Sequence, residues 1–102
     1  MAFTATRNLA AGTKVKVAVP GDVPEYSTWD DDGGRISGNL KKRLQGLFFA
    51  GNPKIHAEIM YVSRESERAR LRRKGLVKVR LRDPAGCSLT ITADPNNLVT
   101  AR

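Results

Sequence analysis

The feature of this sequence best suited to chemistry is a concentration of positive charge late in the chain. Residues 64–82 hold nine of the 18 Lys and Arg side chains and only two carboxylates. Arginine outnumbers lysine there, which favours bidentate contacts with phosphate groups and stacking on bases. Bound phosphates release counterions, which offsets the gathering of like charges, so nucleic acid (DNA or RNA) or another polyanion is the expected partner. The predicted contacts are Arg72, Arg73, Lys74, Lys78, Arg80 and Arg82, with a second patch at Lys41, Lys42 and Arg43.

Aromatic side chains that could stack on bases are few. Phe48 and Phe49 fit a core, which leaves Tyr26, Trp29 and Tyr61 as candidates for stacking or for contact with a partner. Trp29 follows several acidic and turn-forming residues, and we expect it to pack on the core as a lid. Binding with little sequence specificity is therefore predicted.

The residue types needed for catalysis or metal binding do not form a recognisable set. His56 is the only histidine and Cys87 the only cysteine, and both fall in predicted strands. One Cys and one His do not make a zinc site, and we expect Cys87 to be a buried core thiol. The run of three aspartates before Gly33 is not a calcium loop, because Lys41 stands where a bidentate glutamate is required. We predict no enzyme activity, cofactor or metal.

Length and composition favour one folded domain over residues 1–102. A chain of this size can bury roughly 60 to 65% of its unfolded surface, and 24 of its residues are Leu, Ile, Val or Phe. A lone cysteine gives no internal disulfide, and no apolar run reaches the length of a signal peptide or a membrane span. The expectation is a cytoplasmic protein without membrane contact, with an N-terminal arm at residues 1–12.

The first half of the chain predicts a strand and a long loop, and it leaves the segment after them ambiguous. Thr13 to Val19 alternates, with Val15, Val17 and Val19 on one face. Residues 21–34 hold all five acidic side chains of the first third, and their Gly, Pro and Asp content predicts a long loop. Residues 36–49 carry Leu, Ile and Phe at helical spacing with Ser37 as a cap, but two glycines weaken the pattern, so a helix and a strand or loop are both compatible with this segment.

The second half predicts a sheet with a charged connection. Residues 54–62 alternate as a strand, with Ile55, Ala57, Ile59 and Tyr61 on one face. Residues 63–74 fit a short helix, with acidic residues at its positive end and basic ones before Gly75, or an exposed loop.

A hairpin is the clearest element of the sequence. Leu76 to Arg82 and Cys87 to Ala93 flank the turn residues Asp-Pro-Ala-Gly. Alternation directs Val77, Val79 and Leu81 inward and the Lys and Arg residues between them outward, so that a cationic row stands on the solvent face. On the second strand the same pattern directs the hydroxyls of Ser88, Thr90 and Thr92 outward.

Three segments, GTKVKV from Gly12, KGLVKVRLRD from Lys74 and TITADPNNLVTA from Thr90, resemble the small SH3-like barrels, including KOW-type and Tudor-like members. The resemblance covers about half the chain. It implies a mainly β protein with minor α, a partly open barrel with a helical or loop insertion, whose terminal turn lies at Pro95 to Leu98. An α+β fold with an antiparallel sheet is the alternative.

The resemblance implies a binding module without choosing its ligand. The second functional hypothesis is accordingly a protein–protein interaction or structural accessory module, of the kind encoded by phages or mobile elements. It would use a sheet edge or the 21–34 loop, and homo-oligomers through the edge are compatible with it.

Overall fold

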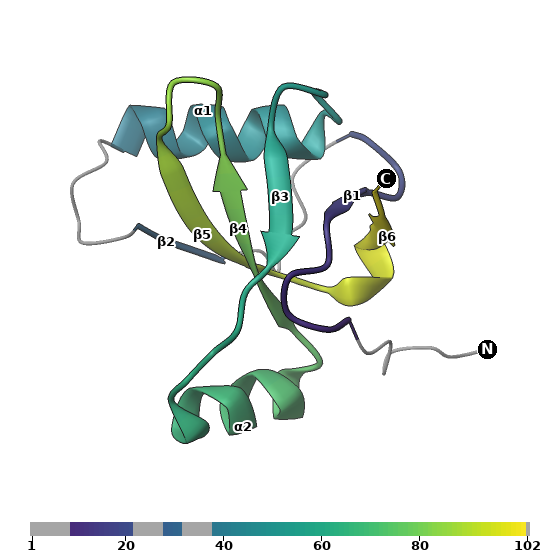
Figure 1. Cartoon of the computed structure of the whole chain (residues 1–102), viewed down its shortest axis with the longest axis vertical. Coiled ribbons are helices and arrows are strands. Elements are labelled where there is room, and N and C mark those ends of the chain that lie inside the picture. The colour runs from purple at the N-terminus through teal and green to yellow at the C-terminus, as the bar shows by residue number, and fades with distance from the viewer. Residues whose placement is uncertain (1–8, 22–27, 32–37, 102) are drawn as a thin grey trace.

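The computed structural model describes residues 9–21, 28–31 and 38–101 (Figure 1). In chain order the elements are β1 (Val15–Val17), β2 (Thr28–Asp31), α1 (Gly38–Phe49), β3 (His56–Ile59), α2 (Glu65–Lys74), β4 (Val77–Arg82), β5 (Ser88–Ala93), the 3₁₀ turn η2 (Pro95–Asn97) and β6 (Leu98–Thr100). Neither helix of this described part is long and apolar enough to cross a membrane.

The strands form two antiparallel sheets. The larger has the order β2-β5-β4-β3, and the smaller pairs β1 with β6, the first described strand with the last. A bridge between Lys14 and Glu58, and a hydrogen bond of 2.8 Å from the Ile59 N–H to the Thr13 carbonyl, join β1 to β3. Among the described residues neither sheet closes into a barrel. The chain is mainly sheet with two helices, as the α+β prediction states.

The predicted hairpin is confirmed. β4 and β5 pair from Val77 with Ala93 to Arg82 with Ser88. At the turn the Asp83 carbonyl accepts from the Gly86 N–H at 3.0 Å, while the Asp83 carboxylate accepts from the Cys87 N–H at 2.8 Å. Asp83 therefore accepts hydrogen bonds from two successive backbone N–H groups where the second strand begins, which fixes the register of the two strands.

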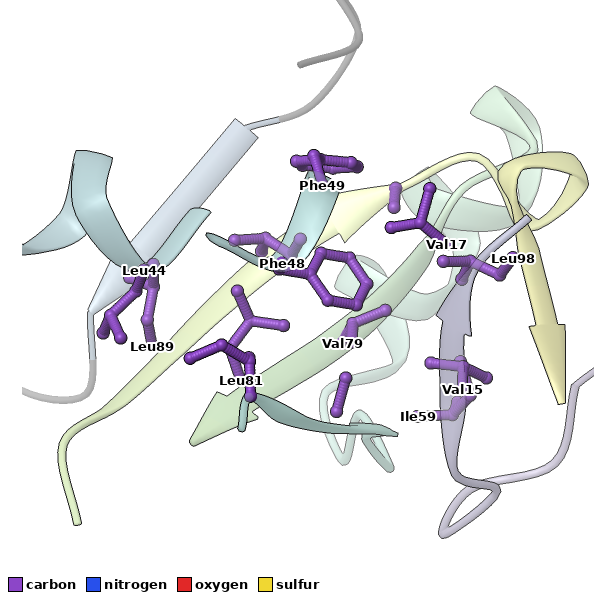
Figure 2. Packing of buried hydrophobic residues seen from close by; sticks show 14 residues of the cluster. Val15, Val17, Leu44, Phe48, Phe49, Ile59, Val79, Leu81, Leu89 and Leu98 are labelled. Carbon is purple, nitrogen blue, oxygen red and sulfur yellow. The ribbon is translucent and has the colours of Figure 1, made fainter. Parts of the chain in front are cut away.

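The hydrophobic core lies between α1 and one face of the larger sheet. Val79, Leu81 and Leu89 are fully buried. Figure 2 shows Phe48 of α1 directed towards the two β4 residues, with Val17 and Leu98 closing the side of the core. The apolar half of the β4 pattern therefore faces inward as predicted.

Helix α1 resolves the choice left open for residues 36–49 in favour of a helix over Gly38–Phe49. Leu44, Phe48 and Phe49 are buried on its sheet side, and the expected cap at Ser37 lies outside the described residues. The helix ends because Gly51 adopts φ +76, where a Cβ would also lie 3.0 Å from the Pro20 ring. Both restrictions require glycine at this position.

Helix α2 settles the choice left open for residues 63–74. Its cap residue Arg64 makes no side-chain capping bond, and it ends at Gly75 in the left-handed conformation, whose N–H reaches the Arg72 carbonyl at 3.1 Å. Leu71 is its buried residue and lies outside the main hydrophobic cluster. Figure 1 shows α2 beyond the end of the sheet, whereas α1 crosses it.

Val19 and Tyr61, which alternation places on one face with residues that are buried, are themselves exposed, and the exposure of Tyr61 agrees with its prediction as a stacking or partner contact. Val19 is 82% exposed because β1 ends at Val17, which pairs with Leu98, the first residue of the three-residue strand β6. Tyr61 is 68% exposed because β3 ends at Ile59 and the chain then leaves the sheet for α2. The predicted N-terminal arm is described only from residue 9 onward, and Leu9 packs against the core.

Two further predictions about the second strand and the acidic loop are wrong. Thr90 and Thr92 are buried, at 3% and 8% exposure, because β5 is an inner strand and they lie opposite the longer Arg80 and Lys78. The segment 21–34 is not loop throughout, since residues 28–31 form β2 and pair with β5. The remainder of that loop, residue 21 excepted, lies outside the described residues.

We expect Leu81→Ala to lower the free energy of unfolding by about 2 to 5 kcal/mol, because it removes a fully buried side chain from a packed core. Val19→Ala, at an aliphatic position that is 82% exposed, should change it by less than about 0.5 kcal/mol. Urea unfolding followed by circular dichroism measures both. Equal effects of the two substitutions would contradict the inward face assigned to β4.

Candidate polyanion-binding surface

The predicted basic residues lie in three places. Lys42 and Arg43 are exposed on α1, with Lys41 partly buried beside them. The three residues Arg72, Arg73 and Lys74 are exposed in the last turn of α2. Lys78, Arg80 and Arg82 alternate on β4, on the face turned away from α1. The cations of α1 and of β4 therefore lie on opposite sides of the sheet and do not form one patch.

The row on β4 is not uniform. Lys78 has only 15% of its side chain exposed and forms an ion pair with Glu67 of α2, 11 positions earlier in the chain. The hydrogen bond from Lys78 lowers the pKa of Glu67 below its ordinary value of 4.5, and this effect outweighs the opposing desolvation. Lys78 thus holds α2 against β4, which leaves less of its charge for an external anion.

Arg80 and Arg82 have different surroundings along the same strand. Arg80 is partly buried, and pairing places it between Glu58 of β3 and Thr90 of β5. Arg82 is exposed and lies opposite His56. The row therefore becomes more accessible towards the hairpin end of β4.

A groove with a mainly basic polar lining lies between β1 and β3. Its volume is about 660 Å³. Its charged and polar walls are formed by Lys14, Lys16, Asn52, His56, Glu58, Arg80 and Arg82. Four cationic side chains thus face one carboxylate, and Lys14, Lys16 and Arg82 are exposed. Such a site can hold several phosphate oxygens through charge-assisted hydrogen bonds.

Sequence reasoning missed Lys14, Lys16 and His56 as members of this surface. The alternation of the two lysines with Val15 and Val17 places them on an outward face. What no local pattern indicates is that β1 lies beside β3, more than 40 positions later, through the bridge at Lys14. That contact brings the β1 lysines to the same groove as the β4 arginines, with Glu58 of β3 between Lys14 and Arg80.

The basic end of α2 has a structural role that accounts for part of its charge. Cations in the last turn interact favourably with the negative end of the helix dipole. Arg72, Arg73 and Lys74 lie there, and Gly75 closes the turn. Arg70 approaches Glu67 at 3.8 Å, with 58% of its side chain exposed.

Of the predicted aromatic contacts, only Tyr61 has a described side chain. Arg68 donates from Nη1 to the Tyr61 hydroxyl at 3.1 Å and to the Val62 carbonyl at 2.9 Å, and its guanidinium carbon lies 5.8 Å from the ring centroid. Trp29 lies opposite Ile91 in the sheet, but its side chain, like all of Tyr26, lies outside the described residues.

The remaining candidates for chemistry lie apart. Cys87 is partly buried beside the hairpin turn and packs against the core, so it is less enclosed than predicted. His56 is exposed in the basic groove. Among the described residues, no three His, Cys, Asp or Glu side chains gather closely enough to hold a metal ion.

Comparisons with protein-family models, with curated proteins and with solved structures found no match to this chain.

The Lys78–Glu67 pair predicts a pH-dependent contribution to stability. Because the folded-state pKa of Glu67 is lowered, the pair stabilises the fold fully above pH 4.5, and this contribution disappears as pH falls through the lowered pKa. Glu67→Gln should therefore cost about 1 kcal/mol at neutral pH and almost nothing in strong acid. Urea unfolding of both proteins across this pH range measures the difference. The control is Glu65→Gln, an exposed carboxylate of the same helix, and a Glu67→Gln deficit that persists unchanged in acid would contradict the pair.

Proposed function

We propose that this chain is a non-enzymatic binding domain that contacts the phosphate backbone of nucleic acid with little sequence specificity. The observation that carries the proposal is the groove between β1 and β3, where four cationic side chains from two strands face one carboxylate. Backbone phosphates supply regularly spaced charge, and each neutralised phosphate releases a counterion. The formal net charge of +8 favours the same class of ligand over the whole surface.

The central contacts in this proposal are Lys14, Lys16, Arg80 and Arg82. Arg82 is exposed and can approach a phosphate with two of its guanidinium nitrogens. Arg80 is partly buried and forms the floor of the basic groove. Lys78 contributes mainly through Glu67, by holding α2 in place. The cations of α2 and α1 act at longer range in this scheme. Cytoplasmic location and the absence of a cofactor belong to the same proposal.

We also propose that the fold is an embellished SH3-like arrangement. The first described strand pairs with the last, and η2 precedes that last strand. Strands β3, β4 and β5 form a meander between them. In this scheme α1 and β2 occupy the long first connection and α2 the connection between β3 and β4. This element order supports the resemblance, while the helices account for its limited extent in sequence.

A protein-interaction role remains the second candidate because of β2. Within the described residues this strand has a neighbour, β5, on one side only. Such an edge can pair with a strand of another chain. The short length of β2, four residues, makes this edge a smaller surface than the basic groove.

We expect binding to be steeply salt-dependent. If the groove neutralises about four phosphates, log K should fall with log salt at a slope of roughly −3 to −4 for a labelled 20-nucleotide strand or its duplex. Fluorescence anisotropy between 50 and 200 mM salt measures this slope. A wild-type protein that binds neither ligand, or binds without salt dependence, would rule out the proposed function.

A pair of matched charge reversals locates the surface. Lys14→Glu with Arg82→Glu changes two exposed groove residues, so affinity should fall at least about tenfold and the salt slope should flatten by about 2. Lys42→Glu with Arg43→Glu makes the same change in net charge on α1 and should cost less than about threefold. Equal losses would show that only net charge matters, and thermal melts check that both variants fold.

A further inference from the structure

A second groove lies where β3 leaves the sheet for α2, and its wall carries an exposed aromatic ring. Tyr61 is one of two large hydrophobic side chains prominent on the described surface, at 68% exposure. Arg68 holds the ring at its hydroxyl end through a hydrogen bond of 3.1 Å and anchors itself to the Val62 and Ser63 carbonyls at 2.9 and 3.2 Å. The Arg68 guanidinium carbon also lies over the ring, 5.8 Å from its centroid, so the ring is oriented by Arg68 and its other face is the one that a ligand can reach.

The groove beside Tyr61 combines apolar walls with cations. Its volume is about 620 Å³. The apolar lining includes Ile59, Met60, Leu71, Leu76 and Val77. Arg68, Arg72 and Lys78 are the charged residues that line it, and none of the described lining residues is acidic. A ligand that matches this groove has a flat apolar part and carries negative charge.

The two grooves follow each other along the same strands. Along the chain through β3 the basic groove is lined by residues 55–58, and the second groove by Ile59, where β3 ends, and by the three residues that follow it. On β4 Lys78 lines the second groove, whereas Arg80 and Arg82 line the basic one. Eight residues of extended chain span at most about 25 Å, which suits the lower end of the sites of about 4 to 16 nucleotides that small single-strand binders cover.

We propose that the second groove accepts an unstacked base of a single-stranded nucleic acid, with the Tyr61 ring as the stacking platform. The proposal rests on the proposed function, because the backbone of the same strand would run through the basic groove. Base stacking on an aromatic side chain tolerates any sequence, since every base has a π face. An acidic peptide could satisfy the charges, but a fixed, exposed aromatic face beside a phosphate-binding groove favours a base.

The discriminating variant is Tyr61→Leu, which removes the ring and keeps an apolar side chain. For a labelled twelve-nucleotide oligo(dT), affinity should fall roughly 5- to 150-fold, the range for loss of one stacked base. Affinity for inorganic polyphosphate, which has charge but no bases, should stay within about twofold, and the salt slope should not change. The wild-type protein should also prefer the single strand to a duplex of twelve base pairs, whose bases are already stacked.

Two controls separate stacking from structural effects. Tyr61→Phe keeps the ring and removes the hydroxyl that Arg68 contacts, so its affinity for oligo(dT) should match the wild type within about twofold. Val19→Ser removes the other exposed large hydrophobic side chain and should have no effect on binding. Thermal melts accompany each variant, because Tyr61→Leu must fold for its affinity to be interpreted, and Tyr61→Phe gives an independent readout.

The outcomes distinguish this proposal from the one it rests on. If Tyr61→Leu binds oligo(dT) as well as the wild type does, or if Tyr61→Phe is as weak as Tyr61→Leu, the stacking platform is overturned and phosphate binding stands. Equal loss for oligo(dT) and polyphosphate would also overturn it, since Tyr61 would then act through the fold. Loss of binding only for a labelled acidic peptide would assign the groove to a protein partner. A wild type that binds no nucleic acid overturns both proposals.

Discussion

Burial of Val79 and Leu81 beneath α1 is the constraint on which the remaining arrangement depends. Side chains alternate along a strand, so burying the odd positions of β4 directs the even ones to the other face. Antiparallel pairing with β3 then places His56 opposite Arg82, and the bridge at Lys14 brings β1 alongside. The basic groove is therefore a consequence of core packing and strand order. No local preference of the basic residues for one another is needed, and their mutual repulsion opposes it.

The repulsion between the cations is reduced because most of them lie near a negative group of the fold. Lys78 is paired with a carboxylate and largely enclosed, Arg80 lies opposite Glu58, and the last turn of α2 places its cations at a favourable dipole end. Lys14 and Arg82 remain exposed at the groove. A surface of this kind is stable without a ligand because only part of its charge is uncompensated, and that part is what an anion can bind.

Local patterns predicted the elements whose stability is set locally, and they failed where distant partners decide. The Asp-Pro-Ala-Gly turn was sufficient to predict the hairpin, whereas the spacing of Leu44 and Phe48 favoured α1 without deciding it against the two glycines of the segment. The end of β1 before Val19 depends on the length of its partner β6, and the burial of Thr90 depends on strands to either side of β5. The candidate site shows the same division. The outward direction of the β4 cations followed from alternation, whereas the pairing of Lys78 and the approach of β1 required tertiary contacts.

Helix α2 has an unusual position in this scheme because it lies outside the main core yet forms one wall of the second groove. Its attachment consists of one ion pair, the Arg68 hydrogen bonds and the burial of Leu71. Such an element has a lower local stability than the strands it joins, since few apolar contacts hold it. A ligand bound as proposed in the second groove would contact the helix and the sheet together, so its binding free energy would add to this attachment. Occupation of the groove and docking of α2 would then be coupled, with Lys78 lining the groove and Glu67 of α2 holding Lys78 in place.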